Sequence, residues 1–256
     1  MKQKSKASEK AKRLRFGPNK YYALNLMLAR WLRHHAIHGS QYHYVTLGGT
    51  ELRDIVNAGW IDRLLISAVS SYEKDEETAS LAQATADQLA TKGVHVSVIN
   101  EDIFTYRREA ETPHIFYLDL FHPCRPTPYL RHFSDWFLHD VLRTGDLLLI
   151  TSYLGRNVGW TKVLKDYDAE FRQLRYEVFA QQKELYHLAH PLLVLHRALT
   201  ETGLQEEVAL RALGTIRYFD TSSMGLYGIT LQDGATTLPD LLMNVPFWNT
   251  NNSSVK

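Results

Sequence analysis

Cysteine and long apolar runs are scarce in this sequence of 256 residues. Cys124 is the single cysteine, and no stretch of about 18 consecutive apolar residues occurs. One cysteine excludes an internal disulfide framework and a zinc site made of several thiolates. The absence of a long apolar run predicts no membrane-spanning helix. The basic N-terminus also lacks the apolar segment of a secretory signal peptide, so we expect a cytoplasmic protein.

Two common site motifs are also missing. No Gly-x-x-x-x-Gly-Lys-Ser/Thr loop occurs, which argues against a P-loop kinase. Twelve histidines are present, and the pairs His34 with His38 and His187 with His190 have helical spacing. Neither pair has the nearby acid of the zinc pattern His-Glu-x-x-His. We therefore expect no metal site.

Charge is distributed unevenly along the chain. Residues 1–35 carry ten Lys or Arg and one acid, a net charge of +9, whereas the remainder carries 19 basic and 27 acidic residues, a net charge of −8. A cationic arm on an acidic body suits a nucleic-acid backbone. A solubilising tail, or an arm that contacts a neighbouring subunit, would give the same pattern. The candidate nucleic-acid contacts are Lys10, Lys12, Arg13, Arg15, Lys20, Arg30 and Arg33.

Hydrophobic periodicity predicts an α/β fold with one domain. The expected strands are 42–47, 64–69, 94–99, 114–120 and 147–152, and the expected helices between and before them are 19–35, 51–58, 75–92 and 129–142. Such alternation indicates a parallel sheet with right-handed crossovers. Helices are expected over 160–213, as a candidate interface with a protein partner or a second copy. Two later strands, 215–220 and 225–231, read as an antiparallel hairpin.

The domain boundaries follow from composition. Residues 1–15 are polar and basic and are expected to form a flexible arm. Residues 16–240 are expected to form a single α/β domain, because no convincing linker interrupts them. Residues 241–256 read as a loose tail.

Glycines or acids stand at the ends of four successive strands. They are Gly48 and Gly49, Glu73, Asp102 followed by Ile103, and Asp119. With the late helices and the hairpin, this arrangement resembles the class I S-adenosylmethionine-dependent methyltransferases over roughly residues 19–232. The resemblance implies a doubly wound, mostly parallel sheet with helices on both faces and a C-terminal antiparallel β-hairpin. It also implies S-adenosylmethionine as the cofactor.

The resemblance assigns a role to each strand end. The Gly48–Gly49 turn would hold the amino-acid end of the cofactor, and Glu73 would bind both ribose hydroxyls, since a carboxylate accepts two hydrogen bonds. Asp102 would contact the adenine amine, with Ile103 or Phe104 as a stacking wall. Asp119 would face the methyl donor. Local structure offers alternatives, because Glu73 heads an acidic run suited to a helix start and Asp102 would also cap a turn.

The glycine turn departs from the family pattern acid–x–Gly–x–Gly–x–Gly. In register, Thr46 replaces the acid, while Thr50 and Leu52 replace two of the glycines. A Cβ restricts both close backbone approach and positive φ. Glu51 is a candidate for the missing carboxylate; otherwise cofactor binding is weak or lost.

The acceptor side offers fewer signals. His122 and Tyr153 follow the fourth and fifth strands, and His122 is a candidate general base. The dipeptide Pro123–Cys124 is similar to the nucleophile of cytosine-C5 methyltransferases, but its distance from Asp119 is too long and no Glu-Asn-Val partner occurs. An inert thiol is the simpler interpretation of Cys124.

Three functions remain open at this point. The first is an S-adenosylmethionine-dependent methyltransferase that acts on nucleic acid. The second is an inactive methyltransferase-fold scaffold or binding subunit, which the altered glycine turn favours. The third is a nucleotide-cleaving TIR-like domain, because residues 65–99 resemble the opening of that fold.

Overall fold

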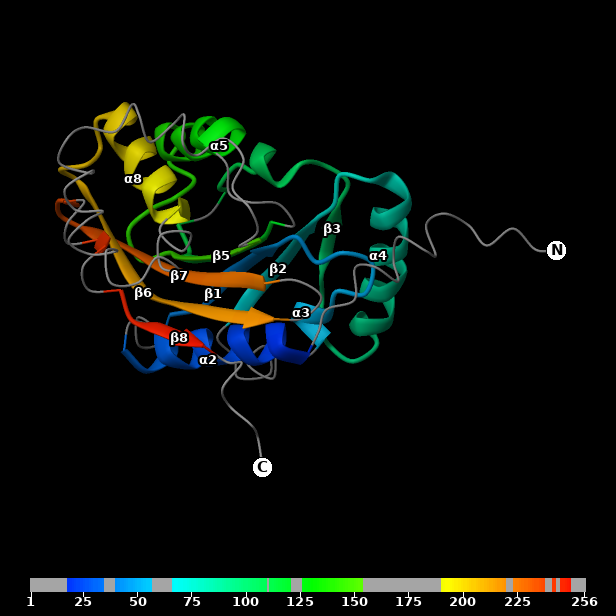
Figure 1. The fold of residues 1–256 in the computed structure, drawn as a ribbon. Coiled ribbons are helices and arrows are strands. Elements are labelled where there is room, and N and C mark those ends of the chain that lie inside the picture. Colours follow the sequence, from blue (N-terminus) through cyan, green and yellow to red (C-terminus); the bar gives the residue numbers. More distant parts are fainter. Residues whose placement is uncertain are drawn as a thin grey trace.

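The computed structural model describes nine segments of the chain (Figure 1). They are residues 18–34, 40–56, 66–109, 111–120, 126–153, 190–219, 223–237, 241–242 and 245–249. All structural statements below concern these residues.

Eight strands form one sheet in the order β3-β2-β1-β4-β5-β7-β6-β8. Their bounds are β1 Tyr42–Thr46, β2 Ile66–Tyr72, β3 Ser97–Ile99, β4 His114–Asp119, β5 Leu147–Tyr153, β6 Val208–Phe219, β7 Ser223–Asp233 and β8 Phe247–Asn249. Strands β1 to β5 pair in parallel, and β7 pairs antiparallel with both β5 and β6. The expected mostly parallel sheet with a C-terminal hairpin is therefore confirmed. The TIR-like interpretation takes β2 as the first strand of the fold. In this sheet β1 precedes β2 along the chain and lies between β2 and β4, and that interpretation does not account for it.

Helices cover both faces of the sheet (Figure 1). Helices α5 (Pro126–Leu138) and α8 (His190–Thr202) lie on one face, and α2 (Pro18–His34) lies on the other. Side chains of β1 alternate between these layers: Tyr42 and Tyr44 pack in the cluster with α2, and Val45 packs in the cluster with α5 and α8. Because successive strand residues point to opposite faces, apolar residues on both sides of β1 and β4 require two covering layers.

The helix after β2 shows why these residues form these elements. In α4 (Glu76–Ala90), Ala79, Ala82, Ala86 and Leu89 recur at helical spacing and are buried. Asp75 caps the N-terminus, because its carboxylate accepts the Thr78 N–H at 3.0 Å. Gly93 follows the helix with φ +82°, the left-handed conformation that commonly ends helices.

Several element boundaries differ from the sequence-based expectations. Strand β3 spans three residues rather than six, and β6 already begins at Val208, so residues 208–213 of the expected helical interface are strand. Residues 160–189 of that interface lie outside the described part of the chain. Within the expected C-terminal tail, Leu241 and Leu242 are buried and β8 pairs in parallel with β6. Short edge strands such as β8 carry a weak periodic signal, which explains the difference.

A polar network is buried at the amino-terminal ends of the parallel strands. Asp146 accepts hydrogen bonds from Arg108 on both oxygens, at 2.6 and 2.7 Å, and also accepts the N–H groups of His114 and Arg143. His114 Nε2 lies 2.6 Å from the Tyr106 hydroxyl, and its Nδ1 lies 2.6 Å from the Thr112 carbonyl. Burial lowers the pKa of His114 to about 3, so this imidazole is neutral. Its Nε2 therefore accepts a hydrogen bond from the Tyr106 hydroxyl.

No helix in the described segments is long and apolar enough to cross a membrane.

Candidate functional site

The order of the strands marks one place where a ligand is expected. Strands β1 and β4 are neighbours, and the chain continues outward from them in opposite directions, to β2 and β3 on one side and to β5 on the other. In open α/β sheets the crevice at such a switch point, beyond the carboxyl ends of the strands, binds ligands. Thr46 and Asp119 are the last residues of β1 and β4.

The turn after β1 leaves little room for a side chain at its first position, Gly48. A Cβ on Gly48 would lie 2.6 Å from Leu52 Cδ2 and 2.7 Å from Ser71 Oγ, both too close for real contacts. The Gly48 N–H donates a hydrogen bond to Ser71 Oγ at 3.2 Å, which ties the turn to β2. Gly49 has φ +59° and Leu52 has φ +43°. Leu52 stands in the third glycine place of the family pattern, and its backbone keeps the conformation that glycine favours.

Asp54 of α3 (Arg53–Val56) lies directly beneath this turn. It is 1% exposed, and its Oδ2 accepts hydrogen bonds from the Tyr44 hydroxyl at 2.9 Å and the Thr46 hydroxyl at 2.6 Å. Its Oδ1 is buried without a hydrogen-bond partner in the described structure, and would lie 3.6 Å from a Gly48 Cβ. Burial raises the pKa of Asp54, and its two hydroxyl partners oppose that rise.

Asp119, at the end of β4, is bonded on both oxygens. Its Oδ2 pairs with the ammonium group of Lys20 from α2, and its Oδ1 accepts the hydroxyl of Thr151 from β5. Both partners of the Lys20 ion pair are buried, with side chains 7% and 1% exposed. A buried charge is expensive unless it is paired, so this contact fixes the start of α2 against the strand ends.

Comparisons with known proteins place this arrangement among solved folds. No family model matches the sequence, and no curated protein matches it significantly. An S-adenosylmethionine-dependent methyltransferase from Clostridium acetobutylicum matches in structure with a TM-score of 0.51 and 10% identity, over 88% of this chain and 96% of that chain. A protein from Listeria monocytogenes, provisionally described as a class I methyltransferase of this kind, matches with a TM-score of 0.50 and 10% identity, over 94% and 69%.

The chain has the fold of the class I S-adenosylmethionine-dependent methyltransferases. A further match is LepI in complex with S-adenosylhomocysteine and a substrate analogue, with a TM-score of 0.47, 12% identity and coverage of 88% of this chain. This chain spans about half the length of LepI, 52%.

Glu73 is the residue that the sequence resemblance assigns to the cofactor ribose. Strand β2 runs to Tyr72, farther than the sequence predicts, so Glu73 comes directly after the strand. Its N–H donates to the Ile99 carbonyl at 3.0 Å, and its carbonyl accepts the Asn100 side-chain amide at 2.8 Å. These bonds fix the backbone of Glu73 beside the end of β3. Asp75 caps the helix start next to it, and the Glu73 carboxylate accepts the Asp75 N–H at 3.3 Å, so the alternative role of Glu73 at the helix start is also present.

Asp102 and its neighbours are engaged within the protein. Asp102 accepts the Phe104 N–H at 3.1 Å as the cap of a 3₁₀ turn (Ile103–Thr105), and pairs with Lys74 at 3.1 Å. Burial acts to raise the pKa of Asp102, but the Phe104 N–H and the Lys74 ammonium outweigh it and lower the pKa. Ile103 is 2% exposed, and Phe104 stacks on His132 of α5 with ring centroids 4.1 Å apart. The alternative role of Asp102 as a turn cap is thus present.

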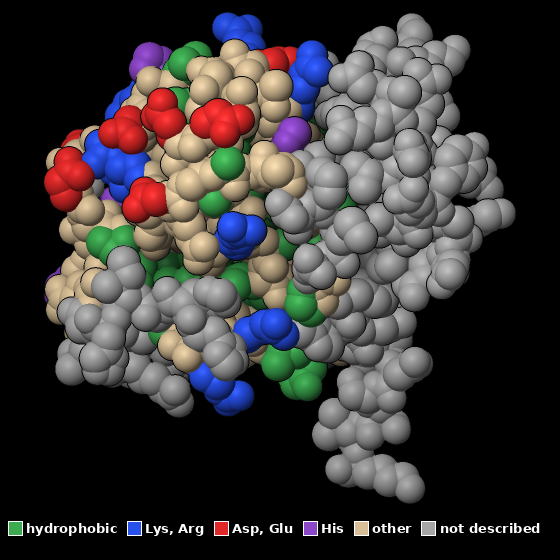
Figure 2. Space-filling model, turned by 90° about the vertical axis from the view of Figure 1, so that its left-hand side faces the viewer, with side chains coloured by type: hydrophobic (Ala, Val, Ile, Leu, Met, Phe, Trp, Pro, Cys, Tyr) green, Lys and Arg blue, Asp and Glu red, His purple; other side chains and the backbone are tan. Residues whose placement is uncertain are grey.

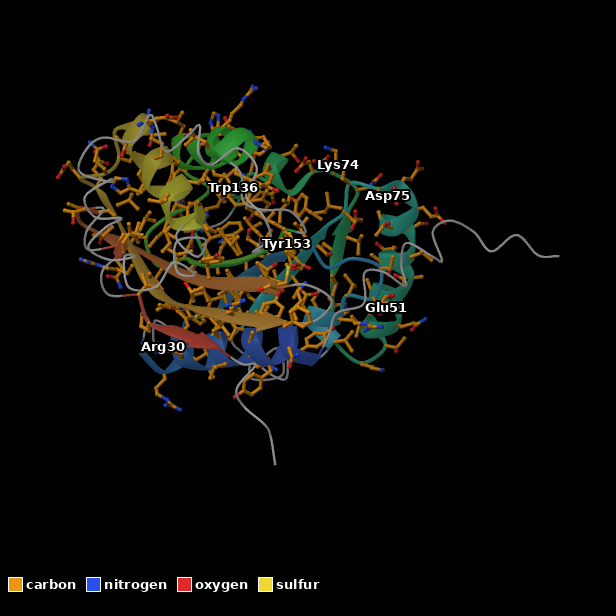
Figure 3. The ribbon with its side chains drawn as sticks, viewed as in Figure 1. Arg30, Glu51, Lys74, Asp75, Trp136 and Tyr153 are labelled. Atoms are coloured by element: carbon orange, nitrogen blue, oxygen red, sulfur yellow. The ribbon has the colours of Figure 1, made fainter. Side chains whose placement is uncertain are left out.

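The remaining candidates are spread more widely. Figure 3 shows Glu51 near the C-terminal turns of α4, and Lys74 with Asp75 near the N-terminal end of that helix. Glu51 is exposed and pairs with Arg53, so the buried carboxylate at the turn comes from Asp54 instead. Tyr153 ends β5, two residues after Thr151 and on the same face of the strand. His122 lies outside the described residues, as do Cys124 and the histidines 35, 38 and 187.

One predicted nucleic-acid contact is in a different place than expected. Lys20 is buried against Asp119 and is therefore not on the surface that a polyanion would meet. Arg33 of α2 is exposed, and Arg30 is half-buried. Lys10, Lys12, Arg13 and Arg15 lie outside the described residues.

Sequence reasoning missed Asp54, Lys20 and Ser71 as parts of this site. A signal for Asp54 was present, because it is an acid between the apolar residues Leu52 and Ile55, where an acid needs a reason. Lys20 gave no such signal, because a lysine in a basic N-terminal region reads as a surface charge.

Proposed function

We propose that this protein binds S-adenosylmethionine at the carboxyl ends of β1 to β4 and transfers its methyl group to an acceptor. The observation that carries the proposal is the set of polar groups at the switch point of a methyltransferase fold: Gly48 held to Ser71, Glu73 at the end of β2, and Asp119 at the end of β4. S-adenosylmethionine, when bound, supplies a methyl group on a positively charged sulfur.

The residues around this position fit such a cofactor by chemistry. Glu73 offers carboxylate oxygens to a pair of ribose hydroxyls, and the buried Asp54 oxygen offers an acceptor to a positively charged donor. Asp119 and Tyr153 end neighbouring strands beside the switch point, where an acceptor would approach. Catalysis then requires mainly that the groups at these strand ends, Tyr153 among them, orient the acceptor in line with the methyl group.

Calorimetric titration tests the proposal with three ligands: S-adenosylmethionine, S-adenosylhomocysteine and 5′-methylthioadenosine, which lacks the amino-acid end. We expect binding of the first two in the micromolar range. Absence of heat and of thermal stabilisation with all three at millimolar concentration would contradict the proposal.

Glu73→Gln should weaken all three ligands, because each contains the ribose. Loss of a charge-assisted hydrogen bond costs roughly 1.5–3 kcal/mol, or about 10- to 100-fold in affinity. The melting temperature should stay close to that of the unaltered protein, because Glu73 is not a buried charge. Glu76→Gln, an exposed acid in the first turn of α4, is the matched control. Unchanged affinity in Glu73→Gln would remove Glu73 from the ribose site.

A nucleic acid is the acceptor class that the charge distribution favours. The support is the net charge of +9 on residues 1–35 against −8 on the remainder. On the face drawn in Figure 2, acidic side chains gather around a few Lys or Arg side chains, and the other basic side chains stand in small separate groups. Such a body attracts a polyanion poorly by itself, so we assign attraction to the N-terminal arm.

Deletion of residues 1–15 should weaken binding to RNA or DNA and reduce its dependence on salt. The deleted segment carries seven Lys or Arg and one acid, so several phosphate contacts and their released counterions would be lost. Affinities measured by fluorescence anisotropy at low and high salt check this. Equal affinities and equal salt slopes for both forms would exclude the arm from nucleic-acid binding.

A second function, a scaffold without methyl transfer, is favoured by two observations. Leu52 fills the third glycine place of the turn, and the Asp119 carboxylate is already neutralised by Lys20. Both features reduce the room and the charge available to a cofactor. The three-ligand titration separates the two functions, because a scaffold would bind none of them.

A further inference from the structure

Asp54 has an unusual bonding state for a buried acid. Two neutral hydroxyls, those of Tyr44 and Thr46, donate to the same oxygen, Oδ2. The other oxygen, Oδ1, is buried with no donor in the described structure. A carboxylate oxygen removed from water without a replacement hydrogen bond destabilises the folded protein. Such an uncompensated group calls for a physical explanation, and a ligand that donates a hydrogen bond to it is one.

The charges around Asp54 do not balance. Asp119 and Lys20 are close enough to act on Asp54, with the Asp119 charge disfavouring its ionised form and the Lys20 charge favouring it. Lys20, however, is ion-paired with Asp119. When Asp54 is ionised, two carboxylates face one ammonium, which leaves one negative charge at the buried switch point. A positively charged ligand group would compensate it.

The chemistry of the proposed cofactor identifies the positively charged group that would bind Asp54. S-adenosylmethionine carries two positive groups, the α-ammonium group of its amino-acid end and the sulfonium. An ammonium group has N–H donors, and the Asp54 Oδ1 needs a donor. A sulfonium has none. Asp119, in contrast, already has a partner on each oxygen and needs no further donor.

We propose that Asp54, through its Oδ1, binds the α-ammonium group of the cofactor. This inference rests on the proposed function. The oxygen would lie 3.6 Å from a Gly48 Cβ, and Leu52 Cδ2 and Ser71 Oγ fill the space at that position, so the ammonium reaches the oxygen only when the Leu52 side chain moves. Leu52, whose side chain lies there, has φ +43°, a strained conformation for leucine that eases rearrangement of the turn.

This assignment explains the altered glycine turn. Thr46 stands where the resemblance expects an acid, and the Thr46 hydroxyl is bonded to Asp54. The carboxylate has moved from the end of β1 to α3, eight residues later, and reaches the same place through space. The exposed Glu51, the other candidate for this carboxylate, is paired with Arg53.

Asp54→Asn, a neutral isostere, tests the assignment with the same three ligands. The affinities for S-adenosylmethionine and S-adenosylhomocysteine should fall about 10- to 100-fold, because both contain the ammonium group. The affinity for 5′-methylthioadenosine should change less than about twofold, as an ordinary additive effect of a site it does not touch. The melting temperature of the ligand-free variant should equal or exceed that of the unaltered protein, because an uncompensated buried charge is removed.

The outcomes separate this inference from the proposed function. If the unaltered protein binds none of the ligands, both fail. If it binds and Asp54→Asn loses all three equally, or loses none, the Asp54 assignment alone is wrong. A melting temperature of Asp54→Asn lowered by several degrees would also overturn the Asp54 assignment, because it would show a structural role for Asp54. If 5′-methylthioadenosine binds too weakly to titrate, the melting temperature is the deciding measurement. Asp233→Asn, an exposed acid at the opposite edge of the sheet, is the matched control.

Discussion

Replacing Lys20 by methionine should lower the free energy of unfolding by about 3–5 kcal/mol, because removal of one partner leaves a buried charge unpaired. Asp119 would keep the Thr151 hydroxyl as its remaining partner, which is too little for a carboxylate that is 1% exposed. Methionine fills a similar volume, so the loss reports charge rather than packing. Chemical denaturation followed by circular dichroism measures it.

Two further variants show whether the ion pair causes this loss. The double variant Lys20→Met with Asp119→Asn should recover much of the stability, since it contains no unpaired charge and the introduced amide oxygen still accepts from Thr151. Lys74→Met is the matched control, because Lys74 makes an exposed ion pair with Asp102 that should contribute less than about 1 kcal/mol. A Lys20→Met protein as stable as the Lys74→Met protein would show that the Lys20–Asp119 pair does not stabilise the fold.

Arg108→Met should also lower the free energy of unfolding by about 3–5 kcal/mol. Arg108 lies at the amino-terminal ends of the strands, whereas Lys20 lies at their carboxyl ends. Arg108 makes two hydrogen bonds to Asp146, and the two side chains are 3% and 0% exposed. Asp146 also holds the N–H groups of His114 and Arg143, so it joins the start of β4 to the turn before β5. Without the guanidinium, that junction contains a buried carboxylate with no positive partner.

The loss of folding stability in Arg108→Met should depend on pH. Burial already raises the pKa of Asp146 to about 7, although Arg108 acts to lower it, and removal of Arg108 raises the pKa further. A group whose folded pKa lies above its unfolded pKa binds a proton more readily when folded, so its contribution to stability is lost as pH rises through the folded pKa. The variant should therefore be less destabilised at about pH 5, where Asp146 is neutral, than at about pH 8.5.

Arg107→Met provides the control for this prediction. Arg107 is the neighbouring residue and makes an exposed ion pair with Asp135 at 3.3 Å, so its replacement should have little effect at either pH. Adding Asp146→Asn to Arg108→Met should abolish the pH dependence. A loss in Arg108→Met that is the same at both pH values would show that Asp146 does not carry it.

The two buried ion pairs occupy opposite edges of one sheet and have different consequences. At the amino ends of the strands, Asp146 has a donor on each oxygen and the network serves stability. At the carboxyl ends, Asp54 keeps one oxygen without a donor in the described structure. Arg108 Nε is also buried without a partner in the described structure, so what distinguishes the carboxyl ends is that the unbonded atom there is a carboxylate oxygen beside the glycine turn.

Much of the fold was predictable from local signals. The regular alternation of apolar strands with helices predicted the parallel sheet, and the spacing of Gly48, Glu73, Asp102 and Asp119 indicated the strand ends at which we propose the site. Those signals are strong because strands buried on both faces and helices with one buried face must repeat their apolar residues with fixed periods. Strand β8 and the early start of β6 were missed, since short or edge strands are decided by pairing with distant partners.

The sequence by itself determined the fold class, the order of the elements and the strand ends at which polar residues gather, because these depend on neighbours along the chain. The tertiary structure alone decided the pairing of charges. Lys20 and Asp119 are 99 positions apart, and Arg108 and Asp146 are 38 apart. The packed sheet and helices decide which side chains come together and leave water. They therefore decide that Lys20 contacts a carboxylate instead of solvent, and that Asp54 instead of Glu51 lies beneath the glycine turn.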